Sequence, residues 1–204
     1  MALLVFCITV VMSCIFSNQT KLSSSAPSAV AFVLFWFLLL WLAMIEGGQG
    51  ALVGLQPLDK NLYEDSHPIA HKCTVIAHKG DNMERFIVGR QFLVVLIVFV
   101  TNMSGAALPG TTVLGLPSIL NSIFIGSGVA MMLTTIIVGQ LTAQVNAANC
   151  MLDFINVYFM LFSTYVSLGI EFSGLLHSVY LVQYLFAMIT GEPVKTKEEP
   201  RSAG

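Results

Sequence analysis

Charged residues are scarce in this chain, and their scarcity decides the class of protein. Of 204 residues, 9 are Lys or Arg and 11 are Asp or Glu, so 10% are charged, whereas soluble domains carry about 25%. Hydrophobic residues make up 56%, and the net charge is −2. This composition excludes a separate soluble domain and a basic surface for nucleic acid. It predicts an all-α, polytopic helical membrane protein.

Cysteine is scarce as well, and the usual catalytic patterns are missing. The four cysteines are spread over apolar runs and one polar loop, which is not a disulfide framework. In that loop, the spacing of His67, His71, Cys73 and His78 matches no common zinc module. The apolar part holds no Ser–His–acid set and no nucleotide-binding glycine loop. We therefore expect no enzyme and no cofactor.

Long apolar runs are abundant, and a membrane-spanning helix needs about 20 such residues. We expect one transmembrane unit over residues 1–190 and a polar tail over 191–204. Glu171, Ser173 and Gly174 divide the last apolar stretch, which is too long for one span. The expected spans cover residues 2–16, 29–45, 86–108, 113–140, 151–170 and 174–190. The run 2–16 is short, so it is either a sixth span or a signal peptide; the missing basic segment before it favours a span.

Basic residues separate a six-span from a five-span arrangement. They gather between the second and third runs and in the tail, at Lys60, Lys72, Lys79, Arg85, Lys195, Lys197 and Arg201. Six spans place both stretches in the cytoplasm, as the positive-inside rule favours. Five spans, with the last two runs merged, would place the tail outside. We therefore expect six spans.

Four short polar motifs interrupt the apolar runs. They are Glu46-Gly47-Gly48-Gln49, Gly89-Arg90-Gln91, Gly139-Gln140-Leu141 and Met151-Leu152-Asp153. Ionisable groups are costly inside a bilayer and by default indicate function there. Because each motif lies at or near the end of a run, alternating helices would bring Glu46, Arg90, Gln140 and Asp153 to one membrane face.

Arg90 needs an acidic partner, because its guanidinium stays protonated and a lone buried charge is very costly. We expect Glu46 or Asp153 to pair with it. The simpler alternative is that these charges only hold helices together. The glycine-rich segment 47–57 is expected to be either a re-entrant segment or an interfacial loop, since glycine disfavours helix.

Three further expectations concern single positions. Gln140 and Gln144 share one helix face if the helix continues. Ser122, Gly126 and Ala130 form a small-x-x-x-small series, suited to close helix packing or to a dimer seam. Glu171 is expected at a membrane surface.

The four motifs together, in this order, resemble those of the silicon transporters, the sodium-coupled silicic acid carriers of diatoms and other silicifying eukaryotes. The stretch Glu84–Phe92 is similar to the family's most typical segment. Full-length members have ten spans in two repeats, whereas this chain has one copy. It resembles the half-length silicon transporter-like proteins, and this resemblance implies a homodimer. We expect the plasma membrane rather than an intracellular vesicle membrane.

The resemblance implies silicic acid as substrate and Na⁺ as coupling ion. Silicic acid is neutral and carries four hydroxyls, so it suits amides that both donate and accept, namely those of Gln49, Gln91 and Gln140. The expected substrate site comprises Glu46, Gln49, Gly89, Arg90, Gln91, Gly139, Gln140 and Asp153. Asp153 or Glu46 would hold Na⁺, which prefers oxygen ligands. The alternatives are a passive channel for a small hydroxylated solute and a tetraspan-like scaffold without a substrate.

Overall fold

The computed structural model describes residues 1–174, 181, 185, 188 and 189. Its described part is helical, with one isolated β-bridge between Thr20 and Ala107 and no strand. The longer helices are α1 (Ala2–Phe16), α2 (Ser28–Gly54), α3 (Pro68–Ala77), α4 (Asn82–Gly105), α6 (Val129–Ile136), α7 (Thr142–Asn149) and α9 (Tyr158–Phe172). The short ones are η1 (Lys60–Tyr63), α5 (Ser118–Asn121), η2 (Ser122–Gly126), η3 (Ile137–Leu141) and α8 (Met151–Ile155).

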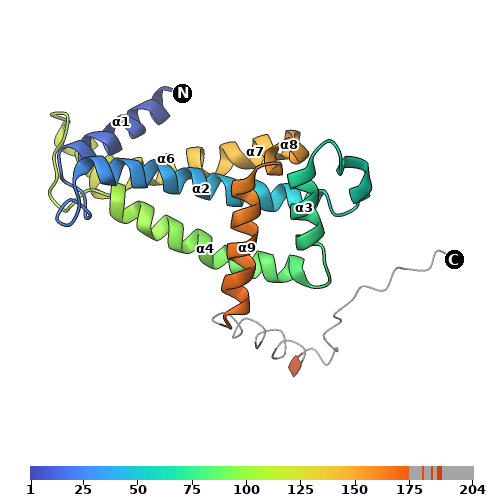
Figure 1. The fold of residues 1–204 in the computed structure, drawn as a ribbon. Coiled ribbons are helices and arrows are strands. Elements are labelled where there is room, and N and C mark those ends of the chain that lie inside the picture. Colours follow the sequence, from blue (N-terminus) through green and yellow to red (C-terminus); the bar gives the residue numbers. More distant parts are fainter. Residues whose placement is uncertain (175–180, 182–184, 186–187, 190–204) are drawn as a thin grey trace.

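Three helices in the described part are long and apolar enough to cross a membrane. They are α2, α4 and the continuous run from Val129 to Asn149 that comprises α6, η3 and α7, and α1 is a shorter apolar helix. Figure 1 shows these three long helices running alongside one another. The predicted class, an all-helical membrane protein, is confirmed. Six spans remain a prediction, and most of the expected run 174–190 lies outside the described residues.

Helix α2 does not break at its glycines, so a re-entrant segment or interfacial loop directly after Glu46 is wrong. The helix runs for 27 residues to Gly54, or about 40 Å. Its glycines are tolerated because neighbours pack into the space that a side chain would fill. Phe154 lies against Gly47, and Met160 lies against Gly48. Packing therefore overrides the low helix propensity of glycine.

The expected span over residues 113–140 is not one helix. Gly128 has a φ of +76°, in the left-handed region that ends or precedes helices. The chain before it forms only the short helix α5 and the π-helical turn η2, and the long helix starts at Val129 and passes Gln140. Ser122, Gly126 and Ala130 therefore do not form a small-residue seam along one helix.

The expected span over residues 151–170 is also divided. Helix α8 ends at Ile155, and Val157 is extended before α9 begins. Asn156 between them accepts hydrogen bonds at Oδ1 from the backbone N–H groups of Ile69 (3.0 Å) and Ala70 (3.2 Å). It thereby caps the N-terminus of α3, which explains why the chain leaves the helical conformation here. The end of α9 at Phe172 agrees with the break expected at residues 171–174.

Helix α2 is the centre of the structure, in contact with α1, α3, α4, α7, α8 and α9. Helix α9 crosses α2 and α4 instead of running alongside them (Figure 1). At that crossing, Trp41 Nε1 donates to Ser163 Oγ at 3.0 Å. A Cβ atom built on Gly89 would clash with the backbone carbonyl of Ser167. Gly89 therefore sets how closely α4 and α9 approach.

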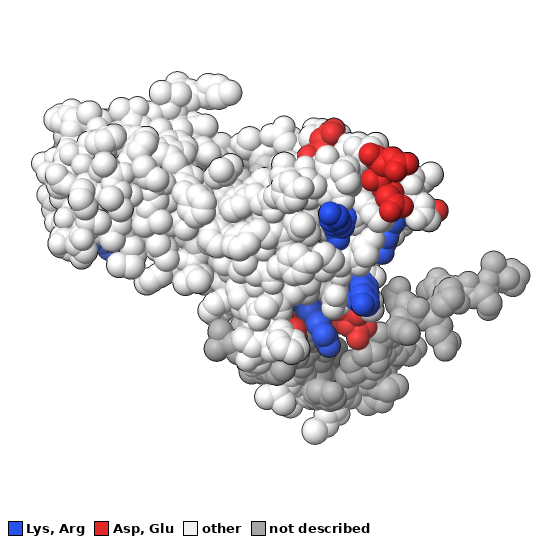
Figure 2. Space-filling model, viewed as in Figure 1, with Lys and Arg blue, Asp and Glu red and all other residues white. Residues whose placement is uncertain are grey.

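Charged side chains gather at one end of the molecule. On the face drawn in Figure 2, they lie mostly over α3 and the segments next to it, while the rest is largely uncharged. This end is tied to α2 by His78, whose Nε2 donates to the carbonyl of Leu52 at 2.9 Å. Tyr63 O–H donates to Thr74 Oγ1 at 2.9 Å within the same polar segment. The polar end is thus a folded cap on the helix bundle.

We predict that Gly89→Ala destabilises the protein, because the added methyl overlaps the Ser167 carbonyl. Such overpacking costs about 1–3 kcal/mol. Gly169→Ala, on the neighbouring helix α9, is the matched control. A Cβ atom at Gly169 would meet no atom outside its own stretch of helix within 4 Å, and alanine favours helix. Thermal unfolding in detergent should show a lower midpoint for Gly89→Ala and an equal or higher one for Gly169→Ala. Equal midpoints for both variants would show that α4 and α9 are not closely packed here.

We predict that acid weakens the cap through His78. Burial lowers the pKa of His78, the Leu52 carbonyl opposes this shift, and Lys60 adds to it. In the unfolded chain the imidazole of His78 has a pKa of about 6.5, so the unfolded state takes up a proton before the folded state does as the pH falls. Stability present above pH 6.5 is lost below it. The unfolding temperature should fall from pH 7.5 to 5.5, and by less in His78→Gln; an identical fall in both proteins would exclude His78 as the source.

Candidate functional site

A buried ion pair joins α2 and α4. The Glu46 carboxylate and the Arg90 guanidinium approach to 3.2 Å between Oε2 and Nη1, and their side chains are 9% and 8% exposed. The predicted pairing of Arg90 with an acid is confirmed, and Glu46 is the partner. Two charges removed from solvent in this way are strongly coupled, because removing either one leaves the other uncompensated.

Two amides extend this pair across three helices. Gln144 of α7 donates from Nε2 to Glu46 Oε2 at 3.1 Å. Gln91 of α4 accepts from Arg90 Nη2 at its Oε1 at 3.2 Å. Both glutamines are exposed, whereas the charges that they contact are buried. The four side chains of Glu46, Arg90, Gln91 and Gln144, which we call the ion-pair group, form one connected polar group within an apolar bundle.

The ion-pair group has unused donor capacity. Arg90 Nε is buried and has no hydrogen-bond partner in the described part of the chain. Arginine carries five N–H donors and no acceptor, and a buried donor without a partner costs about 1–3 kcal/mol. A solute oxygen next to Arg90 would satisfy this donor. The ion-pair group therefore holds one buried donor that the described residues leave unused.

The remaining predicted site residues divide into two kinds. Gln49 and Gln140 are half-buried on the helices that carry Glu46 and Gln144. Gly89 and Gly139 are buried at helix contacts, Gly89 against the Ser167 carbonyl and Gly139 against the side chains of Leu39 and Leu42. The glycines of these two motifs therefore let helices approach, and this contact explains their place beside the polar residues.

Asp153 does not lie in the ion-pair group. Its side chain is 80% exposed and contacts His67, with 3.1 Å between Oδ1 and Nε2. His67 Nδ1 lies 2.9 Å from Ser66 Oγ. The sequence places Asp153 at the start of the expected span 151–170, but the residue belongs to α8, a short helix packed on α2. Its carboxylate contacts His67, just before α3. Asp153 is therefore not the partner of Arg90, and its place in a substrate site with Glu46 stays a prediction.

The third motif lies in a widened helical turn. Gly139, Gln140 and Leu141 belong to η3, a π-helical turn inside the run from Val129 to Asn149. Thr142 Oγ1 donates to the carbonyl of Ile137 at 2.7 Å and closes this turn. π-Helical turns are rare overall, but many of those that occur lie at functional sites. The helical run that holds Gln140 continues through Gln144, and the shared face expected of these two residues stays a prediction.

Sequence reasoning missed a second buried acid. Glu171 was expected at a membrane surface, but it is 4% exposed. Its Oε2 lies 4.0 Å from Arg85 Nε, and both residues line a cavity of about 310 Å³ together with Tyr165 and Leu168. Arg85 precedes Arg90 by five residues on α4, so this one helix carries the basic neighbours of both buried acids.

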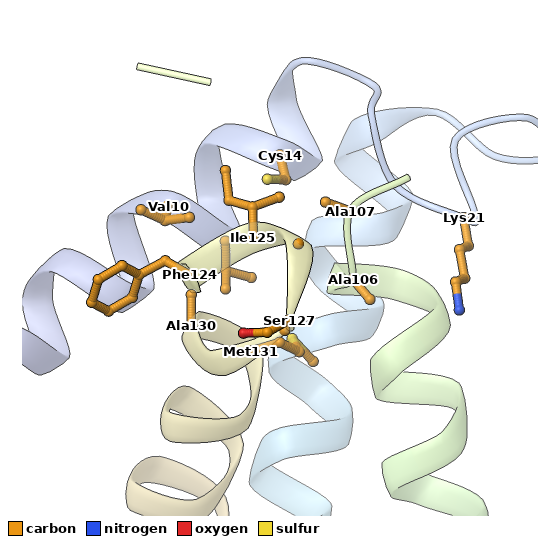
Figure 3. A pocket seen from close by; sticks show the side chains of 14 residues that line it. Val10, Cys14, Lys21, Ala106, Ala107, Phe124, Ile125, Ser127, Ala130 and Met131 are labelled. Atoms are coloured by element: carbon orange, nitrogen blue, oxygen red, sulfur yellow. The ribbon is translucent and has the colours of Figure 1, made fainter. Parts of the chain in front are cut away.

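Another cavity, of about 200 Å³, lies far along the bundle from the ion-pair group. It is lined by the end of α1, the segment after Gly105, the turn η2 and the start of α6. Figure 3 shows Cys14, Ser127 and Met131 around it, with Lys21 at its edge. Its lining contains none of the four motifs.

The histidines and cysteines do not form a metal centre in the described residues, where no three metal-ligating side chains come together. Cys73 is buried and its thiol contacts the Ile155 carbonyl. Burial raises the pKa of Cys73 to about 12, so the thiol stays protonated at neutral pH and is a poor metal ligand.

Long apolar helices with a buried ion pair between two of them define a helical membrane protein with an internal polar site. The comparisons make the class specific. The chain belongs to the silicon transporter family, whose sequence model matches residues 1–204, the whole chain. No curated protein and no solved structure matches it.

Family membership indicates that the chain is an integral membrane protein that transports silicic acid. It indicates a transporter rather than an enzyme. The resemblance inferred from the four motifs is thus confirmed at the level of the family.

We predict that Arg90→Ala destabilises the protein strongly, because Glu46 would be buried without its countercharge. Breaking a buried pair costs about 3–5 kcal/mol. The double variant Glu46→Gln/Arg90→Gln removes both charges and should recover part of the loss. Unfolding midpoints and expression levels of the single and double variants provide the test. A single variant as stable as the wild-type protein would mean that water reaches the pair.

Proposed function

We propose that this chain is a half-length, silicon transporter-like symporter that couples silicic acid uptake to Na⁺ across the plasma membrane. The observation that carries the proposal is the ion-pair group, which links a buried carboxylate and guanidinium to two amides on three different helices. A polar group of this size inside an apolar bundle is the expected signature of a solute pathway.

The chemistry of the ion-pair group suits a neutral polyhydroxyl molecule. Each silicic acid hydroxyl donates one hydrogen bond and accepts others. Glu46 supplies acceptor oxygens, Arg90 supplies donors, and the amides supply both. Gln49 and Gln140 are half-buried on α2 and η3, and we assign them to the same site. A free anion would be repelled by Glu46 and a free organic cation by Arg90, so neutrality of the substrate is favoured.

Sodium coupling can arise at Glu46. Its Oε2 already accepts from Gln144 and pairs with Arg90, so a Na⁺ ion bound to this carboxylate would compete with Arg90 for its charge. Weakening of the pair would release Arg90 donors toward silicic acid oxygens. Na⁺ and silicic acid would then favour each other's binding, as coupled transport requires. Asp153, exposed and paired with His67, has no part in this scheme.

The decisive experiment measures silicic acid uptake into proteoliposomes with an inward Na⁺ gradient, with an equal K⁺ gradient and with no gradient. Uptake that requires the Na⁺ gradient supports the symporter. Equal uptake under all three conditions would identify a passive channel, and no uptake would favour a scaffold. Protein-free liposomes provide the background rate.

We predict that Gln91→Glu lowers uptake while the protein level stays near normal. The substitution keeps an acceptor for Arg90 but removes the two amide donors that would serve substrate oxygens. It also adds a second carboxylate that competes with Glu46 for the guanidinium. Gln56→Glu is the matched control, since Gln56 is exposed beyond the end of α2. Full uptake by Gln91→Glu would remove Gln91 from the site.

We also propose that the working unit is a homodimer. The chain has one copy of each motif, and carriers built from repeats move one half against another. Two identical chains would supply both halves. Light scattering in detergent, corrected for bound detergent, should report about twice the chain mass of 22.1 kDa. Transport by vesicles that each hold a single chain would refute the dimer.

A further inference from the structure

Gln144 lies outside all four family motifs, yet it contacts the centre of the ion-pair group. Its Nε2 donates to Glu46 Oε2 at 3.1 Å, the same oxygen that lies 3.2 Å from Arg90 Nη1. In the described part of the chain, both contacts of the Glu46 carboxylate are made through this one oxygen. Oε1 therefore keeps its capacity to accept a hydrogen bond from a solute.

The exposure of the ion-pair group is graded. Glu46 and Arg90 are buried, whereas Gln144 and Gln91 are exposed on α7 and α4. The two amides are therefore the exposed members of the ion-pair group, and the two charges are its buried members. The two amides differ in what they have left to offer, because Gln144 uses an N–H on Glu46 and Gln91 uses its carbonyl oxygen on Arg90.

Gln144 thus retains a carbonyl acceptor and a second N–H donor beside a carboxylate. A hydroxyl group that donates to Glu46 Oε1 can accept from the remaining N–H of Gln144, and a second hydroxyl on the same atom can donate to its carbonyl. A molecule with several hydroxyls on one tetrahedral centre satisfies both contacts at once. An alcohol with one hydroxyl satisfies only one of them.

We propose that Gln144 is a substrate-binding residue that selects for neutral tetrahedral polyhydroxides over solutes with a single hydroxyl. This assignment rests on the proposed function and adds to it a residue that none of the motifs contains. Its neighbour Asn146 differs in a useful way, because its amide donates to the Thr142 carbonyl of its own helix at 2.8 Å. Asn146 is also exposed and provides a matched control.

The test measures silicic acid uptake against concentration in proteoliposomes of wild-type protein, Gln144→Leu, Gln144→Met and Asn146→Leu. Both Gln144 variants should raise KM about tenfold and keep the maximal rate within about twofold, since ground-state contacts are lost. Asn146→Leu should match the wild-type protein. An unchanged KM, or a fall in maximal rate alone, overturns the assignment.

A second readout separates this inference from the proposed function. Silicic acid should raise the unfolding temperature of the wild-type protein in detergent, because a ligand that binds only the folded state stabilises it. This rise should be lost in Gln144→Leu and kept in Asn146→Leu. Protection without uptake would refute transport while supporting Gln144 as a binding residue. Neither protection nor uptake in the wild-type protein would overturn both proposals.

Discussion

The buried pair of Glu46 and Arg90 is the interaction on which the rest of the site depends. Each charge is about nine-tenths removed from solvent, so neither is stable there without the other. Their need for each other aligns α2 with α4 and brings Gln144 of α7 to the same carboxylate oxygen. Burying two charges and their amide partners in this way is costly to the fold.

Close packing around α2 is achieved by placing glycine next to polar residues. Gly47 and Gly48 follow Glu46 and accept Phe154 and Met160, and Gly89 precedes Arg90 and accepts the backbone of α9. Each polar side chain is thus held by a helix contact one residue away. A substitution at such a glycine would displace the charge beside it, which gives the motifs a structural reason as well as a chemical one.

The backbone departs from regular α-helix at three places in the described part of the chain that bear on the site. The turn η3 widens the helix at Gly139 and Gln140, and Gly128 and Asn156 end helices that the apolar pattern would have continued. Such irregular backbone inside a membrane protein is tolerated when it is buried in protein or lines a cavity. The widened turn lies on the helix of Gln144, so a change in that turn would move this amide relative to Glu46.

The sequence by itself determined the all-helical membrane class, the family and the pairing of Arg90 with an acid. Low charge and long apolar runs indicate the class, the four motifs in order indicate the family, and the cost of a lone buried charge requires the pair. Only the tertiary structure decided that Glu46 rather than Asp153 is the partner of Arg90 and that α2 continues through its glycines. It also decided that Gln144 contacts Glu46 and that Glu171 is buried near Arg85. These outcomes depend on which surfaces meet. Phe154 and Met160 stabilise a helix that glycine alone would weaken, and Asn156 accepts hydrogen bonds from the start of α3 at the point where α8 has ended. Local pattern carries no information on such long-range contacts.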